Sequence, residues 1–158
     1  MRFSRTWIFP VVALMLQVLE PLPLNAGGGG NLKIGNNNYR FVLEDLVSIS
    51  AKANFPGVLK FMGRLIPTDG TAPYKMALTL QKNGTVYMMT IQRRKGKAYP
   101  DSWNATAKTQ VHILKLNDRM GGKVEISCEG PLTGVVGQMP VNADWSGQIS
   151  GVISVEAR

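Results

Sequence analysis

Residues 74–92 read YKMALTLQKNGTVYMMTIQ, and this stretch decides the fold class. Its first half alternates apolar with wetter residues, the apolar positions being Tyr74, Met76, Leu78 and Leu80. A period of two is typical of a strand with one buried face. Asn83-Gly84 follows, a pair that favours the positive φ angles of a two-residue hairpin turn. The stretch therefore predicts an antiparallel hairpin whose second strand is residues 85–92.

Four further segments have strand character and are bounded by Gly, Pro, Asn or Asp: residues 58–66, 111–116, 123–129 and 148–156. Short strands separated by turn signals are typical of a β-sandwich or a small barrel. The chain shows no repeat of fixed period and no internal domain boundary. We therefore expect a mainly β fold, a single antiparallel β-sandwich or small β-barrel over residues 38–158.

Residues 39–54, YRFVLEDLVSISAKAN, fit two structures. The apolar positions match a helical stripe that the asparagines at 36–38 could cap. They also alternate from Tyr39 to Leu43, and the alternation resumes out of phase at Val47, as a bulge at Glu44-Asp45 would produce. The β surroundings favour the bulged strand, and one short helix near residues 39–53 is the alternative.

Residues 1–26 have the plan of a cleaved secretory signal peptide. Arg2 and Arg5 precede an apolar run over residues 7–19, and Asn25-Ala26 ends the segment. The run is shorter than the roughly 20 residues of a membrane-spanning helix, although an uncleaved anchor is the alternative. We expect an exported protein, periplasmic or extracellular, with no transmembrane segment after signal removal. Residues 27–37, rich in Gly and Asn, are predicted to form a flexible N-terminal tail.

The chain is strongly basic, with 18 Lys and Arg against 10 Asp and Glu. Loss of Arg2, Arg5 and Glu20 with the signal would lower the formal net charge from +8 to +7. This excess favours encounter with polyanions such as anionic polysaccharide, lipopolysaccharide, nucleic acid or anionic lipid. A basic protein that gains only solubility from its charge is the alternative.

The sequence RRKGK at residues 93–97 directly follows a predicted strand, so its cations are expected to project from a loop. Cations beside aromatic rings can bind anionic sugars or single-stranded nucleic acid by charge contacts and stacking. The predicted polyanion-binding site consists of Arg93, Arg94, Lys95, Lys97, Tyr99 and Trp103. The alternative is a solvated loop, with Trp103 packed in the core.

His112 and Cys128 are each the only residue of their kind in the chain. A hairpin that pairs Lys115 with Glu125 on its wet side brings His112 opposite Cys128 on its inner side. Such neighbours can form a nucleophilic thiolate, but burial raises the pKa of a thiol and excludes substrate. We expect a buried thiol beside a neutral histidine, and the two lack further metal ligands at the usual spacing.

No phosphate-binding glycine loop or nucleophile elbow is present, and the carboxylates are dispersed. Trp145 and the six methionines after residue 26 are expected to pack in the core. The sequence therefore predicts a non-enzymatic binding or envelope-associated module without a cofactor or metal. One alternative is a β-barrel that carries an apolar small ligand, and another is a hydrolase with dispersed catalytic residues.

Overall fold

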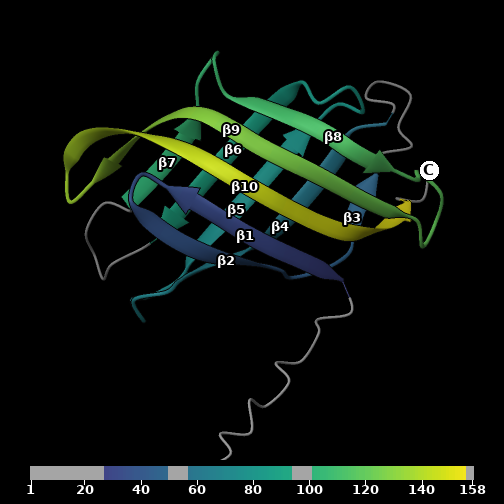
Figure 1. The fold of residues 1–158 in the computed structure, drawn as a ribbon, viewed down its shortest axis with the longest axis horizontal. Helices are drawn as coiled ribbons and strands as arrows, with labels where there is room; N and C mark the ends of the chain where they lie inside the picture. Colours follow the sequence, from purple (N-terminus) through teal and green to yellow (C-terminus); the bar gives the residue numbers. More distant parts are fainter. Residues whose placement is uncertain (1–26, 50–56, 94–100, 156–158) are drawn as a thin grey trace, which may run out of the picture.

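The computed structural model describes residues 27–49, 57–93 and 101–155, and none of these residues is helical. The mainly β fold is thus confirmed (Figure 1). The strands of the described ranges are β1 (Gly28–Ile34), β2 (Asn37–Leu43), β3 (Val47–Ile49), β4 (Leu59–Pro67), β5 (Tyr74–Leu80), β6 (Val86–Arg93), β7 (Asp101–Ala105), β8 (Gln110–Leu116), β9 (Lys123–Val136) and β10 (Met139–Val155).

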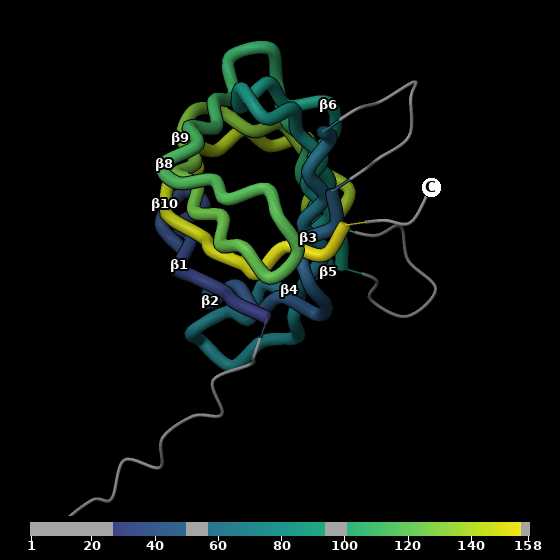
Figure 2. The backbone as a smooth tube through the Cα atoms, turned by 90° about the vertical axis from the view of Figure 1, so that its right-hand side faces the viewer, coloured from purple at the N-terminus to yellow at the C-terminus, as the bar shows by residue number. Residues whose placement is uncertain are grey.

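Eight of the strands close into an antiparallel barrel. Their order around the wall is β1, β2, β4, β5, β6, β7, β9 and β10, and β10 pairs back with β1. Figure 2 shows these strands as a ring. Of the two architectures that the sequence predicted, the structure is the barrel. Closure leaves no free edge between these eight strands, which protects the sheet from pairing with other chains.

The remaining two strands, β3 and β8, pair with the ends of longer strands that extend beyond their other neighbours. β9 has 14 residues and pairs with β8 along its first half and with β7 along its second half. β3 lies between β10, to which it is parallel, and β4, to which it is antiparallel. The segment that fitted both a helix and a bulged strand is therefore extended, with β2 and β3 interrupted at residues 44–46; residues 50–54 lie outside the described ranges.

The prediction of a flexible tail over residues 27–37 is wrong. Residues 28–34 form β1, which pairs with β10 on one side and β2 on the other. Leu32 and Ile34 are buried in the core. The glycines allow close strand approach, because a Cβ on Gly30 would lie 2.0 Å from the Gln148 carbonyl oxygen. A glycine run that suggested flexibility is thus the packing surface that closes the barrel.

The hairpin of residues 74–92 forms as β5 and β6, but its predicted two-residue turn does not. The Gln81 N–H donates to the Thr85 carbonyl, and the Gly84 N–H donates to the Gln81 carbonyl, so the loop has three residues. Only Gly84 has a positive φ there, 89°, as three-residue loops require. The tight turn with two positive φ angles joins β9 to β10 at Gly137 (58°) and Gln138 (68°).

Large apolar side chains from every strand of the barrel fill its interior. Trp145 is 1% exposed, as expected for a core residue, and its indole Nε1 donates to the Glu129 carbonyl. The expectation that the six methionines pack in the core is met only by Met76 and Met89, which are buried. Four methionines lie on the outside of the protein instead, namely Met62, Met88, Met120 and Met139.

Candidate functional site

Of the six residues predicted to bind a polyanion, the structure describes Arg93 and Trp103; Arg94, Lys95, Lys97 and Tyr99 lie outside the described residues. Trp103 is buried, and its ring is not available for stacking on a ligand. Arg93 ends β6 and also turns inward. Its guanidinium carbon lies 4.3 Å from the centre of the Tyr74 ring, and its side chain is only 18% exposed.

Asp101 holds Arg93 in this position. One carboxylate oxygen accepts a hydrogen bond from Arg93 Nη2 at 2.9 Å, and the other accepts the Gly137 N–H at 2.9 Å. The hydrogen bond to Asp101 raises the pKa of Arg93 above its usual value, so the guanidinium stays charged. Because both charges are largely buried, each depends on the other for compensation. The pair ties the end of β6 and the start of β7 to the β9–β10 turn.

Four exposed cations lie on the outside of successive strands, and we call them the cationic band: Lys33, Arg40, Arg64 and Lys75. Arg64 on β4 is directly opposite Lys75 on β5. Arg40 is diagonal to Arg64, because its neighbour Val42 is the residue opposite Arg64. Lys33 is likewise diagonal to Arg40 across β1 and β2. Directly opposite side chains have Cβ atoms about 4.5–5.5 Å apart, and diagonal neighbours lie about 7–8 Å apart.

The cationic band contains little compensating charge. Arg64 Nε lies 3.4 Å from Glu44 Oε1, and both side chains are about half exposed. Lys33, Arg40 and Lys75 form no ion pair with another described residue. Like charges directly opposite each other destabilise a sheet. Sequence reasoning missed the band because its four cations are far apart in the sequence, and only the alternation with apolar neighbours indicates that each faces outward.

The outer face of β8, β9 and β10, which we call the paired wall, is arranged differently. Lys115 on β8 is directly opposite Glu125 on β9. His112 Nε2 lies 3.0 Å from Glu129 Oε1, and both of these side chains are more than half exposed. Lys115 and His112 therefore each face an acidic residue across the strands, and the His112–Glu129 contact is within ion-pair distance.

The predicted contact between His112 and Cys128 is wrong. The expected pairing of Lys115 with Glu125 is present, but a bulge at Leu114 then shifts the register. His112 consequently lies opposite Ser127 and points outward, while Val111 lies opposite Cys128. Cys128 is buried, and burial raises the pKa of its thiol to about 12. The two side chains lie on different faces of the sheet and form no catalytic pair.

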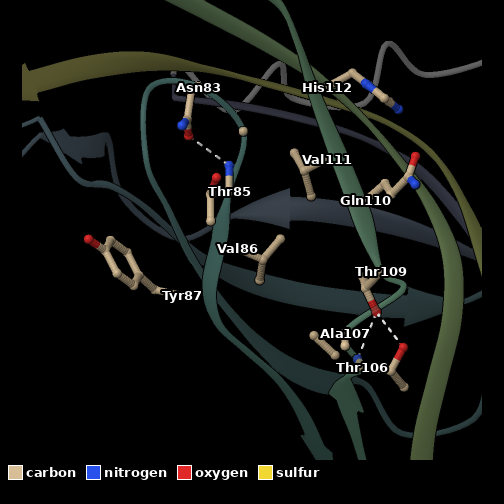
Figure 3. Close-up of a pocket in the computed structure, with 12 residues that line it drawn as sticks. Asn83, Thr85, Val86, Tyr87, Thr106, Ala107, Thr109, Gln110, Val111 and His112 are labelled. Atoms are coloured by element: carbon tan, nitrogen blue, oxygen red, sulfur yellow. Dashed lines mark hydrogen bonds between the residues drawn. The ribbon is translucent and has the colours of Figure 1, made fainter.

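Figure 3 shows a pocket of about 530 Å³ between the start of β6 and the β7–β8 turn. Val86 and Val111 line it with apolar surface, while the Tyr87 ring and the His112 imidazole extend away from its centre. The Thr109 hydroxyl donates to the Pro131 carbonyl and accepts the Thr106 N–H, so the turn itself uses this polar group. The pocket therefore presents no converging set of free polar groups to a ligand.

Within the three described ranges, no group of three or more His, Cys, Asp or Glu side chains could hold a metal ion. The same ranges contain no helix long and apolar enough to cross a bilayer. The fold and surface define a closed β-barrel with an uneven distribution of charge. A scan against family models, a search of curated proteins and a search of solved structures each find no match to this chain.

Proposed function

We propose that this chain is an exported, non-enzymatic β-barrel module that binds a polyanion across the cationic band. The observation that carries the proposal is the juxtaposition of Arg64 and Lys75, two exposed cations directly opposite each other. Glu44 offsets part of the Arg64 charge, but Lys75 forms no ion pair with a described residue, and an anionic partner would turn the remaining repulsion into attraction. The paired wall shows that the same fold can place acidic residues opposite Lys115 and beside His112.

The predicted basic segment can add to this surface. Lys75 is opposite Gln92 on β6, and the chain continues after β6 with Arg94, Lys95 and Lys97. In this proposal those three residues contact the polyanion, as the sequence predicted. Arg93 and Trp103 instead have supporting roles, since one is held by Asp101 and the other is in the core.

Binding to heparin, lipopolysaccharide and single-stranded DNA measured across salt concentrations tests the proposal. The variant combines Arg40→Gln, Arg64→Gln and Lys75→Gln, and its matched control combines Lys108→Gln, Lys115→Gln and Lys123→Gln. The two variants lose the same formal charge. For single-stranded DNA the salt slope is about 0.7 per phosphate contact, so the band variant should lower it by about 2 while the control retains it.

A third variant with Arg94, Lys95 and Lys97 replaced by Ser measures the contribution of the basic segment. We expect it to weaken binding and to add to the effect of the band variant. Absence of binding at low salt would refute the proposal. Equal losses in the band variant and its control would also refute it, because net charge rather than the band would then govern binding. The carrier and hydrolase alternatives gain no specific support from the described residues.

A further inference from the structure

The β9–β10 hairpin projects beyond one end of the barrel (Figure 1). β1 ends at Ile34, which is opposite Trp145, so β10 residues 139–144 extend past the last residue of that neighbour. The hairpin tip, residues 135–140, carries apolar side chains into solvent. Val135 is 38% exposed and Met139 is 68% exposed.

The hairpin tip is apolar on both of its faces. Val135 is paired with Pro140 on one face, and Val136 is paired with Met139 on the other. Alternation turns one face of each strand towards the core, so Val136 is partly buried and packs against the core. Val135, Met139 and Pro140 are exposed. Val135, Met139 and Pro140 lie close together at the turn of one hairpin, and a cluster of exposed apolar side chains can form a contact surface for an apolar phase.

The hairpin tip is also fixed in position. The Gly137 N–H donates to Asp101, whose other carboxylate oxygen is bonded to Arg93. Asp101 is 8% exposed, so water competes little for these bonds. A hairpin held in this way presents its apolar residues without a large loss of conformational entropy on binding.

The register places the hairpin tip on the same cross-strand row as part of the cationic band. On the outer face this row runs in order through Arg64, Lys75, Gln92, Ser102 and Val135. Three strand spacings separate Lys75 from Val135, which amounts to about 14 Å along the curved barrel wall. Arg64, Lys75 and the apolar hairpin tip are therefore exposed at the same end of the barrel.

We infer that this end of the barrel docks on an anionic lipid bilayer, with the hairpin tip entering the acyl boundary and the cationic band contacting headgroups. The inference rests on the proposed function and identifies the polyanion as a lipid surface. A soluble polysaccharide or nucleic acid would engage the band but leave Val135 and Met139 in water. A bilayer matches both features, since binding to it combines apolar burial with attraction to anionic headgroups.

Sedimentation with vesicles of phosphatidylcholine, with and without an equal part of phosphatidylglycerol, tests the inference. The tip variant combines Val135→Ser with Met139→Ser. Its matched control combines Leu114→Ser with Met120→Ser, which are 54% and 66% exposed in the parent and lie on β8 and in the β8–β9 loop. All variants are compared in the same form of the chain, so that residues 1–26 contribute equally wherever they are retained.

We expect the tip variant to bind anionic vesicles about ten- to fifty-fold more weakly, through lost apolar transfer, and the control to bind like the parent. The band variant should lose about five-fold per cation removed. Heparin binding should fall only in the band variant. Trp fluorescence of a Met139→Trp variant should shift to the blue on anionic vesicles and be quenched by brominated lipid.

The outcomes separate the inference from the proposed function. The docking inference is overturned if the tip variant binds vesicles as the parent does, or if the Met139→Trp fluorescence spectrum does not shift. This holds even if the band variant binds heparin more weakly. If the band variant binds heparin and vesicles as tightly as the parent does, the proposed function itself is overturned. Tip-dependent binding that is equal on neutral and anionic vesicles also overturns the inference, because the headgroup contact would then be absent.

Discussion

The cationic band and the paired wall are built from the same strand geometry but use charge in opposite ways. On the paired wall, Lys115 is directly opposite Glu125. In the band, Arg64 is directly opposite Lys75. Opposite charges across two strands stabilise the sheet and like charges destabilise it, each by a fraction of a kcal/mol to about 1 kcal/mol. The arrangement on the paired wall favours stability, whereas the band leaves repulsion that the proposed polyanion would relieve.

A second difference concerns burial. The Arg93–Asp101 pair at the end of the barrel is 18% and 10% exposed, while the His112–Glu129 pair of the paired wall is 54% and 60% exposed. Solvent screens an exposed pair, so it contributes little to stability. Removing one partner of a buried pair leaves an uncompensated charge and is costly. Charge at the barrel end therefore positions structure, and charge on the paired wall mainly balances the surface.

The largest expected effect tests which face of β9 is buried and which belongs to the paired wall. Burial raises the pKa of the Cys128 thiol from its ordinary 9.0 to about 12, so its thiolate is about a thousand-fold scarcer at pH 8. We expect a thiol reagent such as Ellman's to label the folded protein at least that much more slowly than the unfolded chain. Fast labelling would mean that Cys128 faces outward, and Glu125 on the same strand would then face the interior rather than the paired wall.

The raised pKa of the Cys128 thiol also makes the stability of the fold depend on pH. The folded state favours the neutral thiol, so this contribution is complete below pH 9 and declines as pH rises from 9 towards 12. Burial also raises the pKa values of Tyr39 and Tyr74, which adds a loss in the same direction above pH 10. Denaturant unfolding across this range should show the decline. A Cys128→Ala variant should show a smaller decline than the parent.

The next largest effect compares the buried and exposed ion pairs. Asp101→Ala should lower the free energy of unfolding by about 3 kcal/mol, because Arg93 and the Gly137 N–H lose their acceptor. Glu129→Ala should lower it by about 0.5 kcal/mol or less. Urea denaturation measures both. Equal losses would show that burial does not distinguish the two regions.

The smallest effect tests the charge arrangement directly. Lys75→Glu should raise the free energy of unfolding by about 0.2–1 kcal/mol, because it places opposite charges across β4 and β5. Glu125→Lys should lower it by a similar amount on the paired wall. Heparin binding should weaken with Lys75→Glu and not with Glu125→Lys. A Lys75→Glu protein that is less stable than its parent would contradict the view that the band is a stability cost.

The local alternation of apolar and polar residues predicted most strands of the barrel. Residues 74–92 form the expected hairpin because each strand turns one apolar face to the core, and that alternation is visible in a short stretch. The strand at residues 39–49 was likewise favoured by its alternation. The turn at Asn83-Gly84 was not predicted correctly, because Asn-Gly favours a two-residue turn but the pairing of Gln81 with Thr85 leaves room for three residues.

The candidate site was harder to predict. A bulge of one residue at Leu114 reverses the face of every residue beyond it, so His112 and Cys128 separate although the first pairs were expected correctly. The charged run at residues 93–97 predicted a loop of exposed cations, yet Arg93 is bound to Asp101. The cationic band has no contiguous signal, since its residues are spread from position 33 to position 75.

By itself, the sequence determined that this protein is built of short antiparallel strands with an apolar inner face and an excess of positive charge. Both properties depend on residue type and on a period of two, which the chain carries locally. Only the tertiary structure decided that β1 closes a barrel, that four separated cations lie on neighbouring strands, and that the β9–β10 hairpin tip shares a row with Arg64 and Lys75. These relations arise from pairing between distant strands, whose register and closure depend on packing of the whole core.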